Sequence, residues 1–203
     1  MSKSATVRSG RFATVYGVQR DPSLDDKNII RNKKEVKFPF VAGSSYKGEW
    51  TSNSKSGFGI QVECNGDKYE GEWARDMKHG KGTLWIKKGK SHVKQYEGTW
   101  EEDYMCGYGI FYYRDAGVYK GQWLDNKRHG QGRMEYANGD TYEGDWSDGM
   151  RSGEGTLYCA NGNIYEGYWI ADMKEGPGKY LYASTRKVKD IEYSPTLLRY
   201  DDC

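Results

Sequence analysis

Polar and apolar side chains alternate with a period of two along most of the chain, from about residue 41 to residue 183. In Tyr142-Glu143-Gly144-Asp145-Trp146 the tyrosine, glycine and tryptophan fall on one side, and the two carboxylates fall on the other. A period of two is that of a β-strand, in which successive side chains point to opposite faces of the sheet. The pattern therefore predicts strands with one covered face and one solvated face.

This five-residue segment occurs six times, and a Gly-x-Gly pair always begins eleven residues after its tyrosine. A second strand is expected to begin at each glycine pair. A fixed period of this kind is typical of a repeat architecture, here of about twelve strands. The opening tyrosines are spaced 23, 27, 23, 23 and 23 residues apart, at Tyr46, Tyr69, Tyr96, Tyr119, Tyr142 and Tyr165. The segments close at Trp50, Trp73, Trp100, Trp123, Trp146 and Trp169.

The connections between the expected strands carry turn signals. Asn65-Gly66, Asn138-Gly139 and Asn161-Gly162 lie between consecutive units, and Asn-Gly favours a tight hairpin because both residues tolerate positive φ. The connection after each tryptophan is expected to be a longer polar loop, of which residues 74–79 are typical, and the extra residues of the second unit predict a long exposed loop at 87–95. The predicted fold is an all-β, elongated, single-layer antiparallel β-meander, twisted and gutter-shaped.

The repeats divide the chain into three parts. Residues 1–40 match no unit and predict an N-terminal extension, extended or partly disordered, with one short strand at residues 11–18. Residues 41–183 contain the six units. Residues 184–203 predict a cap strand and tail, in which residues 189–193 form a degenerate last strand without the glycine and tryptophan.

Composition indicates how such an array is stabilised. Hydrophobic residues make up 36% of the 203 residues and the mean hydropathy is −0.97, which is low for a two-layer core. Aromatic residues make up 15%, and six of the seven tryptophans lie in the repeat, so burial is expected to come from rings stacked along a thin array. A net charge of +2 gives no argument for nucleic-acid binding. No run approaches the roughly 20 apolar residues that a membrane-spanning helix needs.

Motifs that would carry catalysis are missing. Gly89-Lys90-Ser91 resembles the end of a phosphate-binding loop, but Leu84 stands where that loop needs its first glycine. His79 and His129 occupy equivalent positions in separate units, too far apart in a linear array to share a metal. The carboxylates follow the strand period, as in a solvated face. We therefore expect no enzyme activity, no cofactor and no metal site.

Tyr-Glu-Gly-Asp/Glu-Trp followed by Gly-x-Gly at a 23-residue period resembles the MORN repeat (membrane occupation and recognition nexus) over residues 41–183. The resemblance implies a non-catalytic scaffold protein. Members of the family are attached to cytoskeletal and ciliary structures, to sperm organelles and to membrane-apposed assemblies, where they bind proteins. The resemblance therefore implies a cytoplasmic location in the cytoskeleton, with the axoneme of a cilium or flagellum as the expected setting.

The aromatic concave face is the first candidate binding surface. A single layer is not expected to hide every ring, and exposed tyrosine and tryptophan are frequent anchors of protein interfaces. The expected partner is a helical or extended protein segment from a larger assembly. The candidate residues are Tyr69, Trp73, Tyr96, Trp100, Tyr119, Trp123, Tyr142 and Trp146.

A basic turn edge is the second candidate surface. Five cations recur two residues before a glycine pair: Lys55, Lys78, Arg128, Arg151 and Lys174. Aligned in a stripe, they favour acidic phospholipids or an acidic protein partner, which makes a peripheral membrane module the alternative function. Neighbouring aspartates, such as Asp172, are expected to neutralise much of this stripe. The unpaired terminal strands also raise the alternative of a homodimer.

Overall fold

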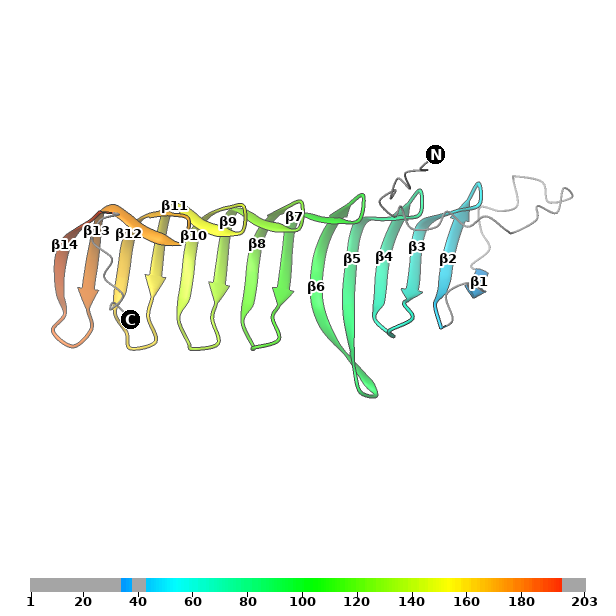
Figure 1. Cartoon of the computed structure of the whole chain (residues 1–203), viewed down its shortest axis with the longest axis horizontal. Coiled ribbons are helices and arrows are strands. Elements are labelled where there is room, and N and C mark those ends of the chain that lie inside the picture. The colour runs from blue at the N-terminus through cyan, green and yellow to red at the C-terminus, as the bar shows by residue number, and fades with distance from the viewer. Residues whose placement is uncertain (1–33, 38–42, 195–203) are drawn as a thin grey trace, which may run out of the picture.

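The computed structural model describes residues 34–37 and 43–194, which form one antiparallel sheet of fourteen strands that follow one another in chain order (Figure 1). Each strand pairs only with its neighbours in the sequence, so the predicted single-layer meander is confirmed. The described residues contain no helix, and so none that is long and apolar enough to cross a membrane. The strands are β1 (Lys34–Lys37), β2 (Ser45–Thr51), β3 (Ser54–Val62), β4 (Lys68–Ala74), β5 (Met77–Lys88), β6 (Ser91–Glu101), β7 (Tyr104–Tyr112), β8 (Val118–Leu124), β9 (Lys127–Glu135), β10 (Thr141–Ser147), β11 (Met150–Tyr158), β12 (Ile164–Ile170), β13 (Met173–Tyr182) and β14 (Lys187–Tyr193).

Two strands lie outside the twelve that the repeats predict. β1 pairs with β2 before the first unit. β14 occupies the stretch of the expected degenerate last strand, and in its pairing with β13 Ile191 lies opposite Gly178 and Tyr193 opposite Gly176. Tyr193 therefore stands where a tryptophan stands in each complete unit. The strand expected at residues 11–18 and the tail after Ser194 lie outside the described residues.

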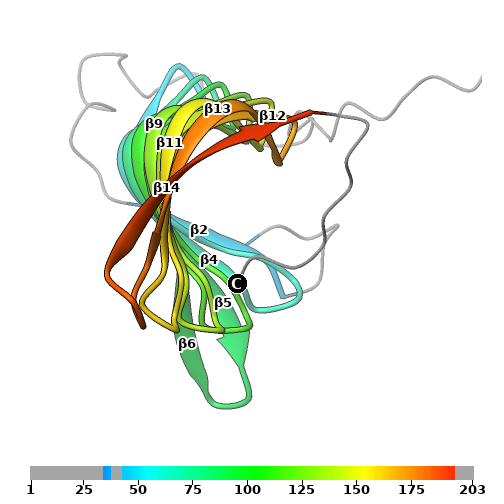
Figure 2. The same ribbon diagram turned by 90° about the vertical axis from the view of Figure 1, so that its left-hand side faces the viewer.

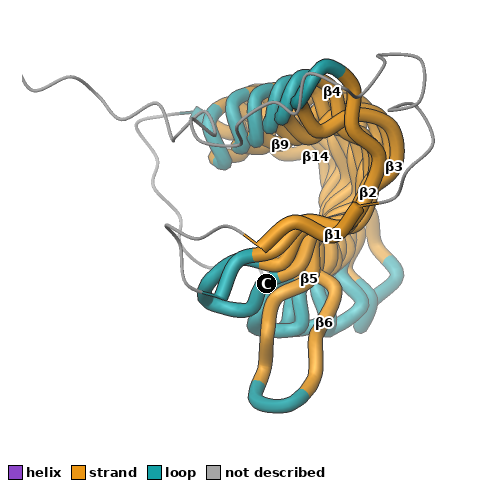
Figure 3. Tube along the Cα trace, turned by 90° about the vertical axis from the view of Figure 1, so that its right-hand side faces the viewer, coloured by secondary structure: helices purple, strands orange, loops and turns teal. Residues whose placement is uncertain are grey.

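The strands curl, and the sheet forms a twisted gutter (Figures 2 and 3). The curl has a local cause in the pairing of the two strands of each unit. Between Gly144 and Trp146 the register with β11 shifts at a β-bulge, and Gly153, opposite this shift, has a φ of +73°. A bulge bends its strand and increases the local twist. Because a shift of this kind recurs along the array, every unit bends at the same level.

The turns after the tryptophans are much tighter than predicted. Arg75 and Asp76 form a two-residue turn with φ values of 51° and 68°, and β5 begins at Met77. Two residues with positive φ are the mark of a type I′ hairpin, whose twist matches that of the flanking strands. The expected polar loop at residues 74–79 is therefore wrong. Residues 74 and 77–79 belong to the ends of two strands, in which side chains alternate between a covered and a solvated face, and not to a loop.

The extra residues of the second unit lengthen a hairpin. β5 has 12 residues and β6 has 11, and the hairpin that joins them extends beyond its neighbours (Figure 1). Ile86 pairs with Val93 and Lys88 with Ser91, so the chain reverses at Gly89-Lys90. The long exposed loop predicted for residues 87–95 is wrong, because β-branched residues on both sides continue the ladder.

The glycine between each tyrosine and tryptophan makes room for the tyrosine ring of its own strand. A Cβ atom on Gly144 would lie 2.5 Å from the Cα of Gly155 and 2.7 Å from the hydroxyl of Tyr142. The glycine between the aromatic residues lowers strand propensity and suggests, from the sequence, that a ring from a neighbouring strand covers it; the ring that covers it belongs to the same strand instead. We call the face that carries these tyrosine and tryptophan rings the inner face, and the opposite face the outer face.

Candidate functional site

The rings of the inner face form one continuous ladder. Each repeat tyrosine contacts the tryptophan of its own unit and that of the next unit edge to face. Tyr119, for example, lies 5.2 Å from Trp123 and 5.3 Å from Trp146, at interplanar angles of 90° and 82°. The contacts continue without a break from Trp50 to Tyr193, which replaces the missing seventh tryptophan. Edge-to-face pairs stabilise by about 0.5–1.5 kcal/mol each beyond the burial of their area.

Hydrogen bonds fix the polar atoms of these rings. The Tyr119 hydroxyl donates to the carbonyl of Gln122 at 3.0 Å, and Trp123 Nε1 donates to the carbonyl of Gly109 in the preceding strand at 3.3 Å. The same tryptophan bond recurs in the four other units that have a preceding glycine pair. Trp50 Nε1 is buried and has no acceptor among the described residues. Burial raises the pKa of the tyrosine phenols, to about 12 for Tyr165.

The predicted partner-binding rings are buried. The eight residues assigned to the exposed aromatic strip have exposed fractions between 0% and 6%. The expectation that a single layer leaves rings exposed is therefore wrong for them. Three features hide them: the sheet curls around them, each tyrosine lies over two glycines, and cationic side chains cover Trp73, Trp100 and Trp146. The rings form the core, and a partner role for them stays a prediction.

The five predicted cations do lie in one row, because each is paired in register with the tryptophan of its own unit or occupies the equivalent position on its strand. They lie over the rings of the inner face. Arg128 Cζ is 4.1 Å from the ring centre of Trp146, and Arg151 Cζ is 4.2 Å from that of Trp169. Lys55 Nζ is 4.1 Å from the ring centre of Trp73. Such contacts stabilise by about 0.5–2 kcal/mol, so the row belongs to the core as well as to the surface.

Aspartates in the turns pair with part of this row. Asp172 accepts hydrogen bonds from the backbone and the Nε of Arg151, both at 3.0 Å, and Asp103 lies 3.6 Å from Lys78 Nζ. The predicted neutralisation therefore occurs at these two cations. Lys55 is partly buried, and burial lowers its pKa to about 8.

Two tyrosines directly after the ends of β7 and β9 also belong to the inner face. Tyr113 and Tyr136 are partly buried and pack against the ring core. Burial raises the pKa of Tyr136, while the guanidinium groups of Arg151 and Arg128 act in the opposite direction. The accessible part of the inner face is thus made of cations and partly exposed tyrosines, with the predicted rings beneath them.

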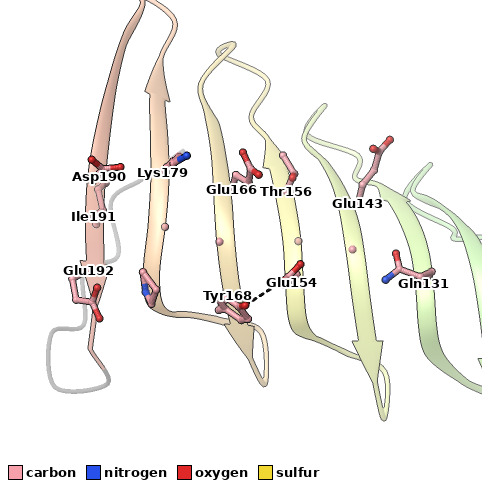
Figure 4. A pocket seen from close by; sticks show the side chains of 15 residues that line it. Gln131, Glu143, Glu154, Thr156, Glu166, Tyr168, Lys179, Asp190, Ile191 and Glu192 are labelled. Atoms are coloured by element: carbon pink, nitrogen blue, oxygen red, sulfur yellow. Dashed lines mark hydrogen bonds between the residues drawn. The ribbon is translucent and has the colours of Figure 1, made fainter.

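The outer face carries a shallow hollow over β9 to β14, with a volume of about 900 Å³. Glycine backbone forms its floor at Gly144, Gly155, Gly167 and Gly178. The side chains stand in two rows, with Glu166 and Asp190 in one and Tyr168 and Glu192 in the other (Figure 4). The Tyr168 hydroxyl donates to Glu154 Oε1 at 2.7 Å. The hollow was not predicted from the sequence, because the carboxylates that line it follow the strand period, as in any solvated face.

Large apolar side chains also lie exposed on the outer face, beside the turns. Their exposed fractions are 50% for Leu124, 40% for Met150, 57% for Ile170 and 53% for Met173. The sequence does contain a signal for them. Ile170 and Met173 flank the turn Ala171-Asp172, and theirs is the one unit in which both positions beside this turn carry a large aliphatic side chain.

The two histidines that precede glycine pairs lie on separate strands. His79 lies on β5 and His129 on β9, both exposed, and no group of three or more potential ligands within residues 34–37 and 43–194 is placed to bind a metal ion.

Comparison with known proteins identifies the repeat. The model of the MORN repeat family matches residues 46–68, 69–91, 96–118, 119–141, 142–164 and 165–184, well over half of the chain. No curated protein matches. Among solved structures, the TCP domain of SAS-4 (dCPAP) from Drosophila melanogaster, in complex with a proline-rich motif of Ana2 (dSTIL), is similar over 79% of this chain and 90% of that one, with 11% identity and a TM-score of 0.43. The six family matches show that the chain belongs to the MORN-repeat family, whose repeats form binding modules.

Proposed function

We propose that this chain is a non-catalytic scaffold that binds a helical or extended protein segment along its inner face, within an axonemal or sperm cytoskeletal assembly. The observation that carries the proposal is the unbroken ring ladder from Trp50 to Tyr193. It couples each unit to the next and gives a stiff rod with the same surface repeated along it. Membership of a family of binding modules supports the role, and the resemblance to its cytoskeletal members supports the setting.

The partner contacts the side chains that cover the rings. Arg128 and Arg151 are partly buried, with 19% of the Arg151 side chain exposed, and Tyr113 and Tyr136 are partly exposed. The eight rings from Tyr69 to Trp146 support this surface from below, so their role toward the partner is positional. Because the row is cationic, an acidic segment with a few apolar side chains fits it best.

Site-specific photo-crosslinking in an extract of ciliated cells tests this proposal. A benzoylphenylalanine placed at Tyr136 reports on the inner face, and one placed at Tyr108, which is 58% exposed on the outer face of β7, is the matched control. We expect a cytoskeletal protein to be crosslinked from position 136 and not from position 108. Crosslinks from position 108 alone would contradict the assignment of the inner face.

The variant Arg128→Gln with Arg151→Gln sharpens this experiment. Glutamine keeps part of the stem over each tryptophan and removes the charge, so the fold is retained while an acidic partner loses its counter-ions. Lys127→Gln is the control, because Lys127 lies next to Arg128 but is exposed on the outer face and pairs with Asp148. Equal crosslinking yield in all three proteins would argue against an acidic partner.

Binding to acidic phospholipids is the second candidate function. The aligned cations favour it, since a row of this kind complements anionic head groups. Their stacking on rings and the pairing of Lys78 and Arg151 with aspartates weaken it. Flotation with phosphatidylserine vesicles discriminates. If lipid binding is the function, the wild-type protein floats with the vesicles, and the variant with Lys78, Arg128 and Arg151 changed to Glu does not.

Two finer proposals concern identity and assembly. The longer hairpin of the second unit and the segment from Gly132 to Asp140 make the chain most similar, within its family, to MORN repeat-containing protein three. Among the described strands, β1 and β14 each pair on one edge, which leaves the other for a homodimer, although charged side chains such as Lys189 and Asp190 on β14 disfavour indiscriminate pairing. Light scattering of the full chain across a concentration series tests the dimer.

A further inference from the structure

We propose that the outer face of β10 to β14 is a second binding site, which takes a basic amphipathic α-helix of a partner protein. This site goes beyond the proposed function, because it lies on the opposite face of the sheet from the cationic row. Three observations support it: the hollow in this part of the outer face, the carboxylates along it, and the apolar side chains at its turn-side edge.

The carboxylates of the hollow are in excess. Among the described residues that line it, Lys179 is the one cation, against Glu143, Glu154, Glu166, Asp190 and Glu192. Glu143 is paired with Arg133, and Glu154 accepts the Tyr168 hydroxyl. Lys179 stands in register between Glu166 and Asp190. No ion pair among the described residues involves Glu166, Asp190 or Glu192, so these three remain available to the cations of a partner.

The apolar side chains lie on three neighbouring strands. Ile170 on β12 is paired directly with Met173 on β13, and Met150 lies at the same edge on β11. Tyr168, 46% exposed, lies between Ile170 and Glu166 on the same side of β12. Exposed apolar side chains that gather in this way mark an interaction surface more often than scattered ones do.

The dimensions fit a helix that lies across the strands. From Ile170 to Glu166 along β12 is about 13 Å, at roughly 3.3 Å per residue. An α-helix with its side chains is about 10–12 Å wide, so one flank reaches the apolar row while the other reaches the carboxylates. An extended segment is too narrow to contact both rows.

The spacing along the array also fits. Alternate strands are about 9.6 Å apart, and seven residues of an α-helix rise about 10.5 Å. Cations seven residues apart on a helix would therefore meet Glu166 on β12 and Asp190 on β14 in turn. The apolar flank of the same helix would cover Met150, Ile170 and Met173.

A designed peptide tests the site. The probe is a labelled helix of about 14 residues, roughly 21 Å long, made of Lys, Leu and Ala, with Lys along one flank and Leu along the other. Its control has the same composition in an order that is not amphipathic. Fluorescence anisotropy with the full chain at physiological salt is expected to show binding of the probe and much weaker binding of the control.

Paired variants assign the binding to this surface. Glu166→Gln with Asp190→Asn is expected to weaken binding of the probe roughly fivefold to tenfold, since exposed charge pairs are individually modest. Ile170→Gln with Met173→Gln is expected to weaken it by about tenfold, from half-exposed side chains that the helix covers. The matched control is Glu70→Gln with Glu97→Gln, which changes the equivalent outer row on β4 and β6 and should bind like wild type.

Three outcomes would overturn the proposal. One is equal affinity for the control peptide, and another is unchanged affinity in both site variants. The third is tighter binding after deletion of residues 1–33, which hold seven Lys and Arg against three Asp and Glu, because the chain's own arm would then be the occupant. None of these outcomes depends on crosslinking from position 136, so this site and the inner face can fail separately.

Discussion

Replacing Tyr119 by alanine would test whether the ring ladder is what stabilises the array. This ring is fully buried near the middle of the sheet, where it contacts Trp123 and Trp146. It also lies over two glycines: a Cβ on Gly121 would be 2.6 Å from its hydroxyl, and one on Gly132 would be 2.2 Å away. Alanine removes both ring contacts, uncovers the backbone of these glycines and leaves the carbonyl of Gln122 without its donor.

The expected loss in the free energy of unfolding is about 4 kcal/mol, since removal of a buried aromatic side chain typically costs about 3–5 kcal/mol. The two edge-to-face contacts, at about 0.5–1.5 kcal/mol each, form part of that loss. Because units in a repeat array are coupled mainly to their neighbours, the loss falls on the coupling between two halves of the sheet. Unfolding is therefore expected to separate into two steps in the variant.

Urea denaturation followed by tryptophan fluorescence and by circular dichroism measures both effects. Tyr108→Ala is the control, because Tyr108 lies on neighbouring β7 but is 58% exposed, and its loss should change stability by no more than about 0.5 kcal/mol. Equal losses in the two variants, or a loss below about 1.5 kcal/mol for Tyr119→Ala, would refute the view that buried rings stabilise the sheet.

Three further predictions concern single positions. Trp123→Phe should cost about 1–2 kcal/mol in urea unfolding because Gly109 loses its donor, whereas Trp50→Phe should change less, since Trp50 Nε1 has no acceptor among the described residues. The pKa of Lys55 in the folded protein is about 8, below its usual 10.5, so between these pH values the unfolded chain binds more protons than the folded one. The free energy of unfolding should therefore rise from pH 7 to 9.5. The variant Lys55→Met should show a smaller rise in the urea midpoint over this range. Asp103→Ala should lower the free energy of unfolding by about 1 kcal/mol in thermal unfolding, because the backbone N–H of Lys78 loses its acceptor. Asp103→Asn should be tolerated, since Asn126 accepts the equivalent hydrogen bond from Met105.

The strand pattern and the fold class were accessible from the sequence because one period governs both. Tyr142, Gly144 and Trp146 recur at i, i+2 and i+4 in every unit, and such spacing specifies which side chains share a face before any contact is known. The row of Lys55, Lys78, Arg128, Arg151 and Lys174 was predicted for the same reason: equivalent positions in a regular array align. The same rule identified residues 189–193 as a candidate last strand.

The sequence period does not specify the curvature of the sheet. The exposed fraction of every ring depends on that curvature. A flat sheet would leave Trp123 largely exposed, whereas the bulges after the glycines curl the strands until only 6% of it is exposed. The prediction of the turns after the tryptophans was wrong for a related reason. Arg75-Asp76 lacks the glycine that usually marks a type I′ turn, so its positive φ values cannot be read from the residue types. At Trp73, Trp100 and Trp146 a cationic side chain completes the burial, and this contact depends on the twist between neighbouring strands.

The burial of the rings changes where function should be sought in this chain. Tyr, Gly and Trp recur in all six units because each must fit the ladder, and side chains that the fold requires everywhere cannot distinguish one partner from another. Selectivity must then come from positions at which the units differ. On the outer face, the residue before the tryptophan is Glu72 in one unit, Gln122 in another and Tyr168 in a third, and the residue after it is Ala74, Leu124 or Ile170. Two of these differences, Tyr168 and Ile170, lie on β12 near Glu166, a carboxylate that forms no ion pair among the described residues. Within one repeat protein, therefore, the invariant positions identify the core, and departures from the repeat are the better guide to its binding sites.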